Sequence, residues 1–287
     1  MTLAAAFHRD LSLDPLFAAF TPWRGWAPAG FDVDFLGQVT ALSFIDGATD
    51  AARMKDRMAW PSYPQINDEI FEWRSLLSAV ISARGSFTMV EAGAGYGRWL
   101  VAGALAARQK ALSTTLVGIE AEPTHFDWLK AHVAANGIAS ADCRLINAPV
   151  AGSQREVIFA GGRPLQWWGQ AIVGSVAEAG DANPMPMISI ALTEILAPLP
   201  HVDLVDMDIQ GAELEVVTAT TRALDQKIKR VHISTHSPVI EAGLRDLFSS
   251  LGWSCLWDFA GQGKRGTPYG ELDFADGVQS WGNPRFQ

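Results

Sequence analysis

Residues 90–99 read VEAGAGYGRW, and this stretch decides the fold. It continues the apolar run Phe87–Met89 and carries glycines at positions 93, 95 and 97. Glycine has no side chain and tolerates unusual backbone angles, so a turn built from it lets a ligand approach the backbone closely. We therefore predict a strand, a ligand-binding turn and then a helix, with a nucleotide-like cofactor at the turn.

The pattern on both sides of this turn alternates between strands and helices. We predict strands at 87–91, 113–120, 143–148, 202–208 and 230–234, and helices at 97–109, 124–136, 212–224 and 239–251. A further amphipathic helix is predicted at 67–84, and two strands at 252–259 and 268–274. Such alternation predicts an α/β fold with a doubly wound, mostly parallel seven-stranded sheet, to which the last two strands add an antiparallel edge.

Composition narrows the class of protein. The chain has 287 residues, 48% of them hydrophobic, and a net charge of −9 without clustered Lys and Arg, which argues against nucleic acid as a partner. Two cysteines and no signal-peptide pattern favour a cytoplasmic location, and no apolar stretch is long enough to predict a membrane span. We expect one domain at 67–287 and an N-terminal extension at 1–66, whose tryptophans suggest a lid. The oligomeric state stays open, with a homo-oligomer as one option.

The glycine spacing separates two kinds of cofactor. A nicotinamide fingerprint has the form GxGxxG, but Arg98 stands where a fingerprint that begins at Gly93 needs its third glycine, and Leu100 stands where one that begins at Gly95 needs it. The observed pattern is ExGxGxG. The next strand ends at Glu120, where a carboxylate can accept hydrogen bonds from ribose hydroxyls, with Glu122 as the weaker alternative. Turn and acid together favour a nucleoside-containing cofactor.

The glycine turn and three further segments carry a family resemblance. The ExGxGxG turn resembles motif I of class I S-adenosylmethionine methyltransferases, whose fold is Rossmann-like. VDLVDMDIQGAELEVV, at 202–217, resembles the signature of FkbM-type methyltransferases. Residues 118–138 and 147–159 resemble the second- and third-strand regions of that family, so that the resemblance covers about 86–255. It implies S-adenosylmethionine as cofactor and S-adenosylhomocysteine as product.

The resemblance also implies a reaction. Members mostly methylate hydroxyl oxygens of sugars, polyketides and other natural products, and sometimes peptide nitrogen. We expect O-methylation of a small molecule or glycan. The alternatives are N-methylation of a peptide or amide, a cofactor-binding protein without catalysis, and a nicotinamide-dependent oxidoreductase. The chain departs from the family at Gln210, where a Glu is usual, and at Ser234, where an acid is usual, whereas the histidine is kept at His236.

The expected cofactor contacts lie at the ends of successive strands. The resemblance places Glu91 near the amino group of the cofactor. The full set is Glu91, Gly93, Gly95, Tyr96, Gly97, Glu120, Ala121, Asn147, Ala148 and Asp208.

Transfer to a hydroxyl group requires a base, because a neutral hydroxyl is a poor nucleophile. His236 is the expected base by its intrinsic pKa, and Asp208 is expected to orient the acceptor or the cofactor. Both also have structural explanations, His236 as a helix cap and Asp208 as an acid favoured by a helix dipole. Glu213 is interpreted as such a dipole-favoured acid.

Acceptor contacts and metal binding complete the sequence-based expectations. Trp167, Trp168 and Gln210 are expected at the substrate, although the tryptophan pair could equally anchor a loop. No metal ion is expected, because Gln210 is uncharged and because Asp206 and Asp208 are taken to point to opposite faces of their strand.

Overall fold

A seven-stranded sheet forms the centre of the computed structural model, which describes residues 8–45, 53–163, 165 and 170–286. Its strand order is β15-β18-β14-β13-β5-β6-β7. The strands are β5 (Ser86–Ala92), β6 (Ser113–Glu120), β7 (Cys143–Asn147), β13 (Leu204–Met207), β14 (Arg230–Thr235), β15 (Ser254–Phe259) and β18 (Gly277–Gly282). The strands β14, β13, β5, β6 and β7 run parallel, and β18 runs antiparallel to both of its neighbours. This order, with one reversed strand next to the edge, is the class I methyltransferase fold and confirms the predicted fold class.

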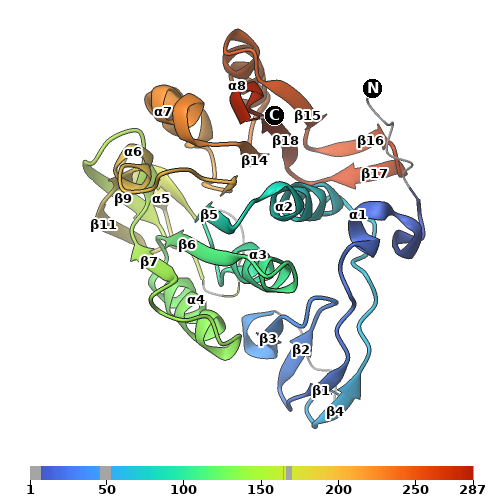
Figure 1. The fold of residues 1–287 in the computed structure, drawn as a ribbon. Coiled ribbons are helices and arrows are strands. Elements are labelled where there is room, and N and C mark those ends of the chain that lie inside the picture. The colour runs from blue at the N-terminus through green and yellow to red at the C-terminus, as the bar shows by residue number, and fades with distance from the viewer. Residues whose placement is uncertain (1–7, 46–52, 164, 166–169, 287) are drawn as a thin grey trace.

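Helices cover both faces of the sheet. α2 (Ile70–Ser82), α3 (Arg98–Gln109) and α4 (Pro123–Ala135) contribute to one apolar cluster, whereas α6 (Leu192–Leu196), α7 (Glu213–Lys227) and α8 (Pro238–Ser250) contribute to another. Neighbouring strand residues point to opposite faces, so Met89 of β5 packs in the first cluster and Val90 in the second. Figure 1 shows α2 and α3 on one side of the sheet and α6 and α7 on the other.

The C-terminal part differs from the prediction. The segment 268–274 was predicted to be a sheet strand, but β17 (Gly270–Phe274) pairs with β16 (Gly263–Thr267) in a separate hairpin. The antiparallel strand of the sheet is β18, which lies between β14 and β15 and is buried along its whole length. The edge strand β15 therefore runs parallel to β14. A strand buried on both faces lacks the alternating pattern that marks a half-buried strand.

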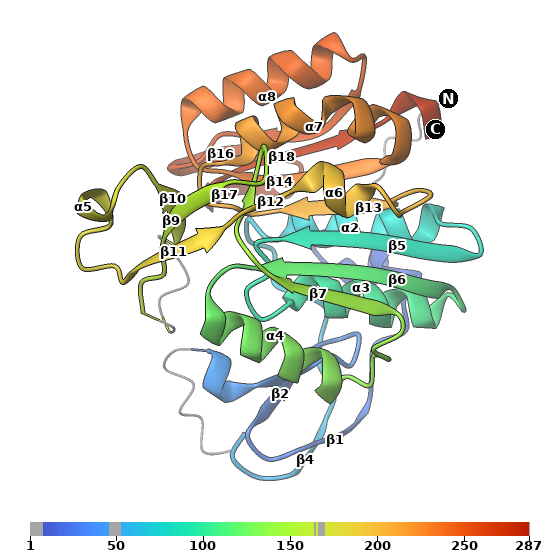
Figure 2. The same cartoon turned by 90° about the vertical axis from the view of Figure 1, so that its left-hand side faces the viewer.

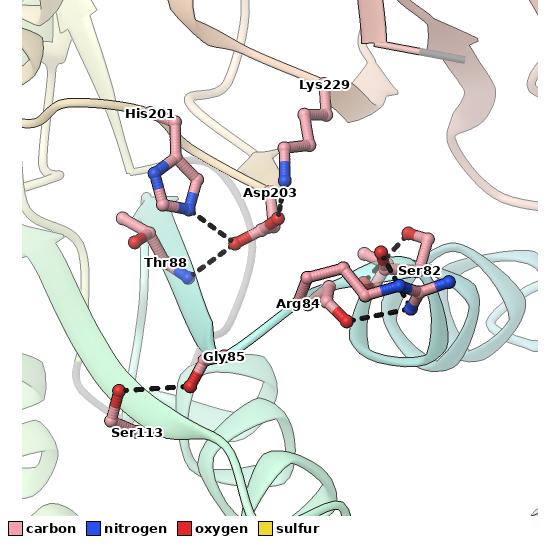
Figure 3. A network of polar contacts seen from close by, with 10 residues as sticks. Ser82, Arg84, Gly85, Thr88, Ser113, His201, Asp203 and Lys229 are labelled. Atoms are coloured by element: carbon pink, nitrogen blue, oxygen red, sulfur yellow. Dashed lines mark hydrogen bonds and ion pairs between the residues drawn. The ribbon is translucent and has the colours of Figure 1, made fainter.

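Polar contacts tie the amino ends of the parallel strands together. Asp203, which is 1% exposed, accepts hydrogen bonds from the backbone N–H of Thr88 at 2.8 Å and from Lys229 Nζ at 2.7 Å. Figure 3 shows His201 beside the same oxygen of Asp203 that accepts from Thr88, with Lys229 at the other oxygen. Charge-assisted bonds to a buried carboxylate are stronger than neutral ones, so this cluster fixes the register of β5 and β13 at the edge opposite the cavity described below.

The N-terminal segment is built from short elements. They are η1 (Leu11–Leu13), α1 (Pro15–Ala18), β1 (Gly25–Ala27), β2 (Phe31–Val33), β3 (Val39–Ala41), η2 (Leu42–Phe44) and β4 (Arg57–Ala59). The segment is attached to α4, because the side chain of Asn136 both accepts from and donates to the backbone of Val39, at 2.8 and 3.0 Å. The rings of Phe44 and Trp128 stack at 5.1 Å between centroids.

An insertion follows β7 and extends past the carboxyl ends of the parallel strands. It comprises β8 (Val150–Ala151), β9 (Glu156–Ala160), β10 (Ala171–Val173), α5 (Val176–Ala179), β11 (Pro184–Ile188) and β12 (Ile190–Ala191). β10, β9 and β11 form a small antiparallel sheet, which Figure 2 shows at the end toward which β5 and β6 point. A final 3₁₀ turn, η3, covers Pro284–Phe286. Within the described ranges, no helix has the length and apolar character needed to cross a membrane.

Candidate functional site

A cavity of about 330 Å³ opens at the carboxyl ends of β5, β6, β13 and β14. It lies where the chain order reverses, since β6 and β13 flank β5 on opposite sides, and this switch point is the usual ligand site in open α/β sheets. The glycine turn, helix α2 and the insertion complete the wall. Gln210, which is predicted at the substrate, is part of the lining, whereas Gly97 and Asn147 of the predicted cofactor set are not. The members of that set that line the cavity are Glu91, Gly93, Gly95, Tyr96, Glu120, Ala121, Ala148 and Asp208.

The glycine turn has the conformation that its composition allows. Gly93, Gly95 and Gly97 all have positive φ, at 79°, 55° and 78°. A Cβ on Gly93 would lie 1.7 Å from the backbone oxygen of Asp208, and one on Gly97 would lie 2.3 Å from Leu129 Cδ1. The first and third glycines are therefore required because the chain packs against itself, in addition to any approach of a ligand.

Glu120 is bonded directly to this turn. Its side chain is buried, and its two oxygens accept hydrogen bonds from the N–H groups of Gly95 and Glu122, each at 2.7 Å. Burial raises the pKa of Glu120 to about 7, although these two bonds act in the opposite direction. Glu122 serves a different purpose, because its side chain caps α4 by accepting from the N–H of His125 at 2.7 Å.

Asn147 supports the site from outside the cavity. Its side chain donates hydrogen bonds to the backbone oxygens of Glu120 at 2.9 Å and Ala121 at 3.0 Å. Asn147 does not line the cavity, whereas Ala148 does. This geometry gives Asn147 the task of holding the strand end that carries Glu120. A contact between Asn147 and the cofactor remains a prediction.

Glu91 lines the cavity and also caps α3. Its carboxylate accepts from the N–H groups of Trp99 at 3.3 Å and Leu100 at 2.9 Å. Burial, and next the negative charge of Asp206, raise the pKa of Glu91 well above its usual value. Tyr96 lies in the turn beside it, with its ring 5.3 Å from that of His132.

Asp208 and His236, which follow β13 and β14, are brought together because these two strands are neighbours in the sheet. His236 Nε2 lies 3.3 Å from Asp208 Oδ1, and its Nδ1 lies 2.7 Å from Glu213 Oε1. Asp208 lines the cavity, whereas His236 lies behind Asp208 and outside the lining. Gln210, which has a φ of 52°, donates to Asp208 Oδ1 at 2.9 Å.

The protonation of this pair depends on its surroundings. Burial opposes protonation of His236, but the hydrogen bond to Glu213 and the charges of Asp208, Glu213 and Asp276 outweigh it and raise the pKa of His236. Burial raises the pKa of Asp208, and the charge of His236 opposes that shift. Glu213 is fully buried, and it also accepts from the N–H of Gly211 at 3.0 Å. Its role goes beyond that of a dipole-favoured acid, because it orients His236.

The floor of the cavity carries a second polar cluster, which we call the floor cluster: Glu72, Asp206 and His232. Burial raises the pKa of Asp206 to about 7, against the effect of its hydrogen bond to Glu72, and burial together with Asp206 raises the pKa of Glu72. Burial lowers the pKa of His232 to about 3, so that its ring is neutral. Sequence reasoning missed Glu72 and His232, because neither belongs to a local motif.

Three sequence-based expectations need correction or restriction. Asp206 and Asp208 both line the cavity, so the expectation that they point to opposite faces is wrong, since residues two apart along a strand share a face. Trp167 and Trp168 lie outside the described residues. Trp23, Trp26 and Trp60, from which we inferred a lid, do not line the cavity, and Trp26 is 68% exposed.

Comparison with known proteins gives distant matches. No family model matches the chain. A protein of Jannaschia sp. (strain CCS1) that bears the name "Putative methyltransferase" is 27% identical over 196 residues, which are 66% of this chain and 70% of that protein. The crystal structure of Methyltransferase FkbM from Methylobacillus flagellatus KT matches with a TM-score of 0.46 and 16% identity, over 69% of this chain and only 44% of that one. A precorrin-6y C5,15-methyltransferase from Geobacter metallireducens GS-15 gives 0.42 and 12%, over 73% and 86%. The fold assignment accordingly rests on the strand order.

Proposed function

We propose that the chain is an S-adenosylmethionine-dependent methyltransferase that methylates a hydroxyl oxygen of a small molecule or glycan. One observation carries the proposal. Glu120 accepts a hydrogen bond from the N–H of Gly95, at the switch point of a sheet with the class I strand order. Glu120 and the turn at 93–97 therefore form one unit. The carboxylate of Glu120 is suited to ribose hydroxyls, and the turn is suited to the amino-acid part of the cofactor.

The charge of the cavity supports this cofactor over a dinucleotide. Eight carboxyl groups line it, and Arg98 is the one Lys or Arg among the described lining residues. Arg98 is itself paired with Glu69 at 2.6 Å. A pyrophosphate would be repelled by the carboxyl groups that are ionised, whereas a sulfonium cation would be attracted to them and would favour the ionised form of the others. The carboxyl groups belong to Asp68, Glu69, Glu72, Glu91, Glu120, Asp206, Asp208 and Asp276.

Individual residues of the cavity fit parts of this cofactor. Glu120 would accept from the ribose hydroxyls with the lone pairs that Gly95 and Glu122 leave free, and the turn at 93–97 would lie along the methionine portion. Ala121 and Ala148 offer the flat, small surfaces that an adenine ring needs. When bound, S-adenosylmethionine supplies a methyl group on a positively charged sulfur. An acceptor lone pair attacks the methyl carbon in line with the sulfur, which leaves as part of S-adenosylhomocysteine.

The acceptor side of the proposal rests on Asp208. Asp208 faces the cavity and would accept a hydrogen bond from the acceptor hydroxyl, thereby orienting its lone pair. As the hydroxyl proton leaves, it passes to Asp208, and a neutral His236 can take it at Nε2. Glu213 holds His236 in the tautomer that carries its proton on Nδ1. His236, the expected base, therefore acts through Asp208.

N-methylation of an amide or peptide is the second candidate, and the acidic cavity favours it if the acceptor is cationic.

One experiment separates O-methylation from N-methylation. The protein is incubated with S-adenosylmethionine that carries a deuterated methyl group and with a mixture of small molecules, and the products are analysed by mass spectrometry. Labelled methyl ethers would support the proposal, and labelled methylamines or methylamides would replace it with the alternative. The Asp208→Asn variant is the control that should yield neither.

A further inference from the structure

The floor cluster contains an unused ligand atom. Glu72 of α2, Asp206 of β13 and His232 of β14 each offer one ligand atom, and the three atoms lie within 4.8 Å of one another. His232 is 1% exposed and Asp206 is 4% exposed. His232 Nδ1 lies 2.7 Å from Ser280 Oγ and 3.1 Å from Ser75 Oγ, and its buried Nε2 has no hydrogen-bond partner among the described residues.

This arrangement of the imidazole is the one that metal-binding histidines show. One ring nitrogen is held by the two serine hydroxyl groups, which fix the orientation of the ring, and in the tautomer that carries its proton on Nδ1 the other nitrogen has a free lone pair. A buried polar atom without a partner destabilises the folded state, so a native protein usually supplies a partner for it. Two carboxyl groups beside such a nitrogen complete a set of two oxygens and one nitrogen.

We propose that Glu72, Asp206 and His232 bind a divalent first-row transition-metal ion, of the Mn²⁺ or Zn²⁺ class. Imidazole nitrogen together with carboxylate oxygen suits these ions, whereas an all-oxygen set would favour Mg²⁺ or Ca²⁺. The ion would be bound by the two carboxyl groups in their ionised form, and Arg98, whose charge acts on Glu72, is already paired with Glu69. The expectation of no metal rested on Gln210 and on the orientation of Asp206 and Asp208, and it did not include Glu72.

A second group with metal-ligand chemistry, Asp208, Glu213 and His236, is the weaker candidate. There His236 Nδ1 is bonded to Glu213, and the same carboxylate accepts from Gly211. His236 Nε2 also lacks a hydrogen-bond partner among the described residues, although it lies 3.3 Å from Asp208 Oδ1. The two groups differ in enclosure, because the Asp208 side chain is 45% exposed and accepts from Gln210, whereas His232 and Asp206 of the floor cluster are at most 4% exposed.

The test is isothermal titration of the chelator-treated full chain with MnCl₂, ZnCl₂ and MgCl₂, in the absence of S-adenosylmethionine. We expect one saturable site for Mn²⁺ or Zn²⁺ and weaker or no binding of Mg²⁺. Glu72→Gln, Asp206→Asn and His232→Gln should each weaken binding at least about tenfold, and Ser280→Ala about 10–100-fold, because it removes the partner that orients the ring. Asp208→Asn is the matched control from the neighbouring group and should keep the affinity.

Three outcomes would overturn the site. They are the absence of saturable binding to the wild-type chain, loss of binding in Asp208→Asn but not in Asp206→Asn, and a floor-cluster variant that lowers S-adenosylmethionine affinity without changing metal affinity. The last result would identify the cluster as the site of a ligand ammonium group. Melting temperatures of all variants show whether each is folded, and the conservative Ser280→Ala keeps the test valid if a ligand variant does not fold. Because the titration contains no cofactor, its failure leaves the proposed methyltransferase function untouched.

Discussion

Glu120 Oε2 accepts a hydrogen bond from the backbone N–H of Gly95 at 2.7 Å, so the acid at the end of β6 and the glycine turn after β5 are one structural unit. The second oxygen of Glu120 accepts from Glu122 N–H, and this fixes the carboxylate at two points. An acid held in this way loses little conformational freedom when a ligand binds, which favours affinity.

The first prediction concerns this unit. Glu120→Gln places an amide N–H₂ against one of the two backbone N–H groups, and it removes the charge that strengthens bonds to ribose hydroxyls. We expect the affinity for S-adenosylmethionine to fall at least about tenfold, which corresponds to the 1–3 kcal/mol of a lost charged bond. Isothermal titration measures it. Glu122→Gln, which alters an acid two residues away, is the control and should bind nearly as the wild type does. Equal affinities of Glu120→Gln and the wild type would remove Glu120 from the site.

The stability of the empty protein should depend on pH through the same residue. The pKa of Glu120 is about 7 in the folded chain and has an ordinary value of 4.5, so between these values the folded state binds more protons than the unfolded state. The contribution of Glu120 to the free energy of unfolding is therefore greatest below about pH 4.5 and is lost as the pH rises toward 7. Urea unfolding across this range should show the difference between wild type and Glu120→Gln shrinking or reversing with increasing pH. A difference that does not change with pH would contradict the shift.

Gly93 provides a test of the fold around the turn. Gly93→Ala places a Cβ 1.7 Å from the backbone oxygen of Asp208, so β13 and the turn must separate. We expect a loss of about 4 kcal/mol or more in the free energy of unfolding, at the severe end for a single substitution. Gly137→Ala is the control, since Gly137 has a φ of 62° with nothing within 4 Å and should cost only about 1–2 kcal/mol. Similar losses in both variants would mean that the turn and β13 are not packed as described.

The contact between Glu213 and His236 predicts an effect on the pH profile. Glu213→Gln keeps a hydrogen-bond acceptor but removes the charge that raises the pKa of His236, so the acid limb of the kcat/KM profile should move to lower pH. Turnover should fall about tenfold or more, and that of His236→Ala by about 10²–10⁴-fold, while cofactor affinity is retained. Glu215→Gln, which alters an exposed acid in the same first turn of α7, is the control. Unchanged turnover in His236→Ala would remove this residue from the reaction.

Sequence reasoning succeeded where one local pattern determines the structure. The alternation of strand and helix segments gave β6 its observed bounds, Ser113–Glu120, and placed Asp208 and His236 at the ends of two consecutive predicted strands, which pair in the sheet. It failed for β18, because a short strand that is buried on both faces and flanked by glycines resembles a loop in sequence. It also missed Glu72 and His232, which meet Asp206 only because the topology brings α2 and β14 to the same place. Convergence of this kind depends on tertiary packing and leaves no local signal.

The central claim, that the cavity binds S-adenosylmethionine for methyl transfer, is tested most directly by paired thermal unfolding with S-adenosylmethionine and with NADH. At a ligand concentration of 100 Kd, binding to the folded state alone adds about 2.7 kcal/mol to the free energy of unfolding. We predict that S-adenosylmethionine raises the Tm of the wild type clearly, that Glu120→Gln reduces this rise, and that NADH has no effect. A rise in Tm with NADH and none with S-adenosylmethionine would contradict the proposed function.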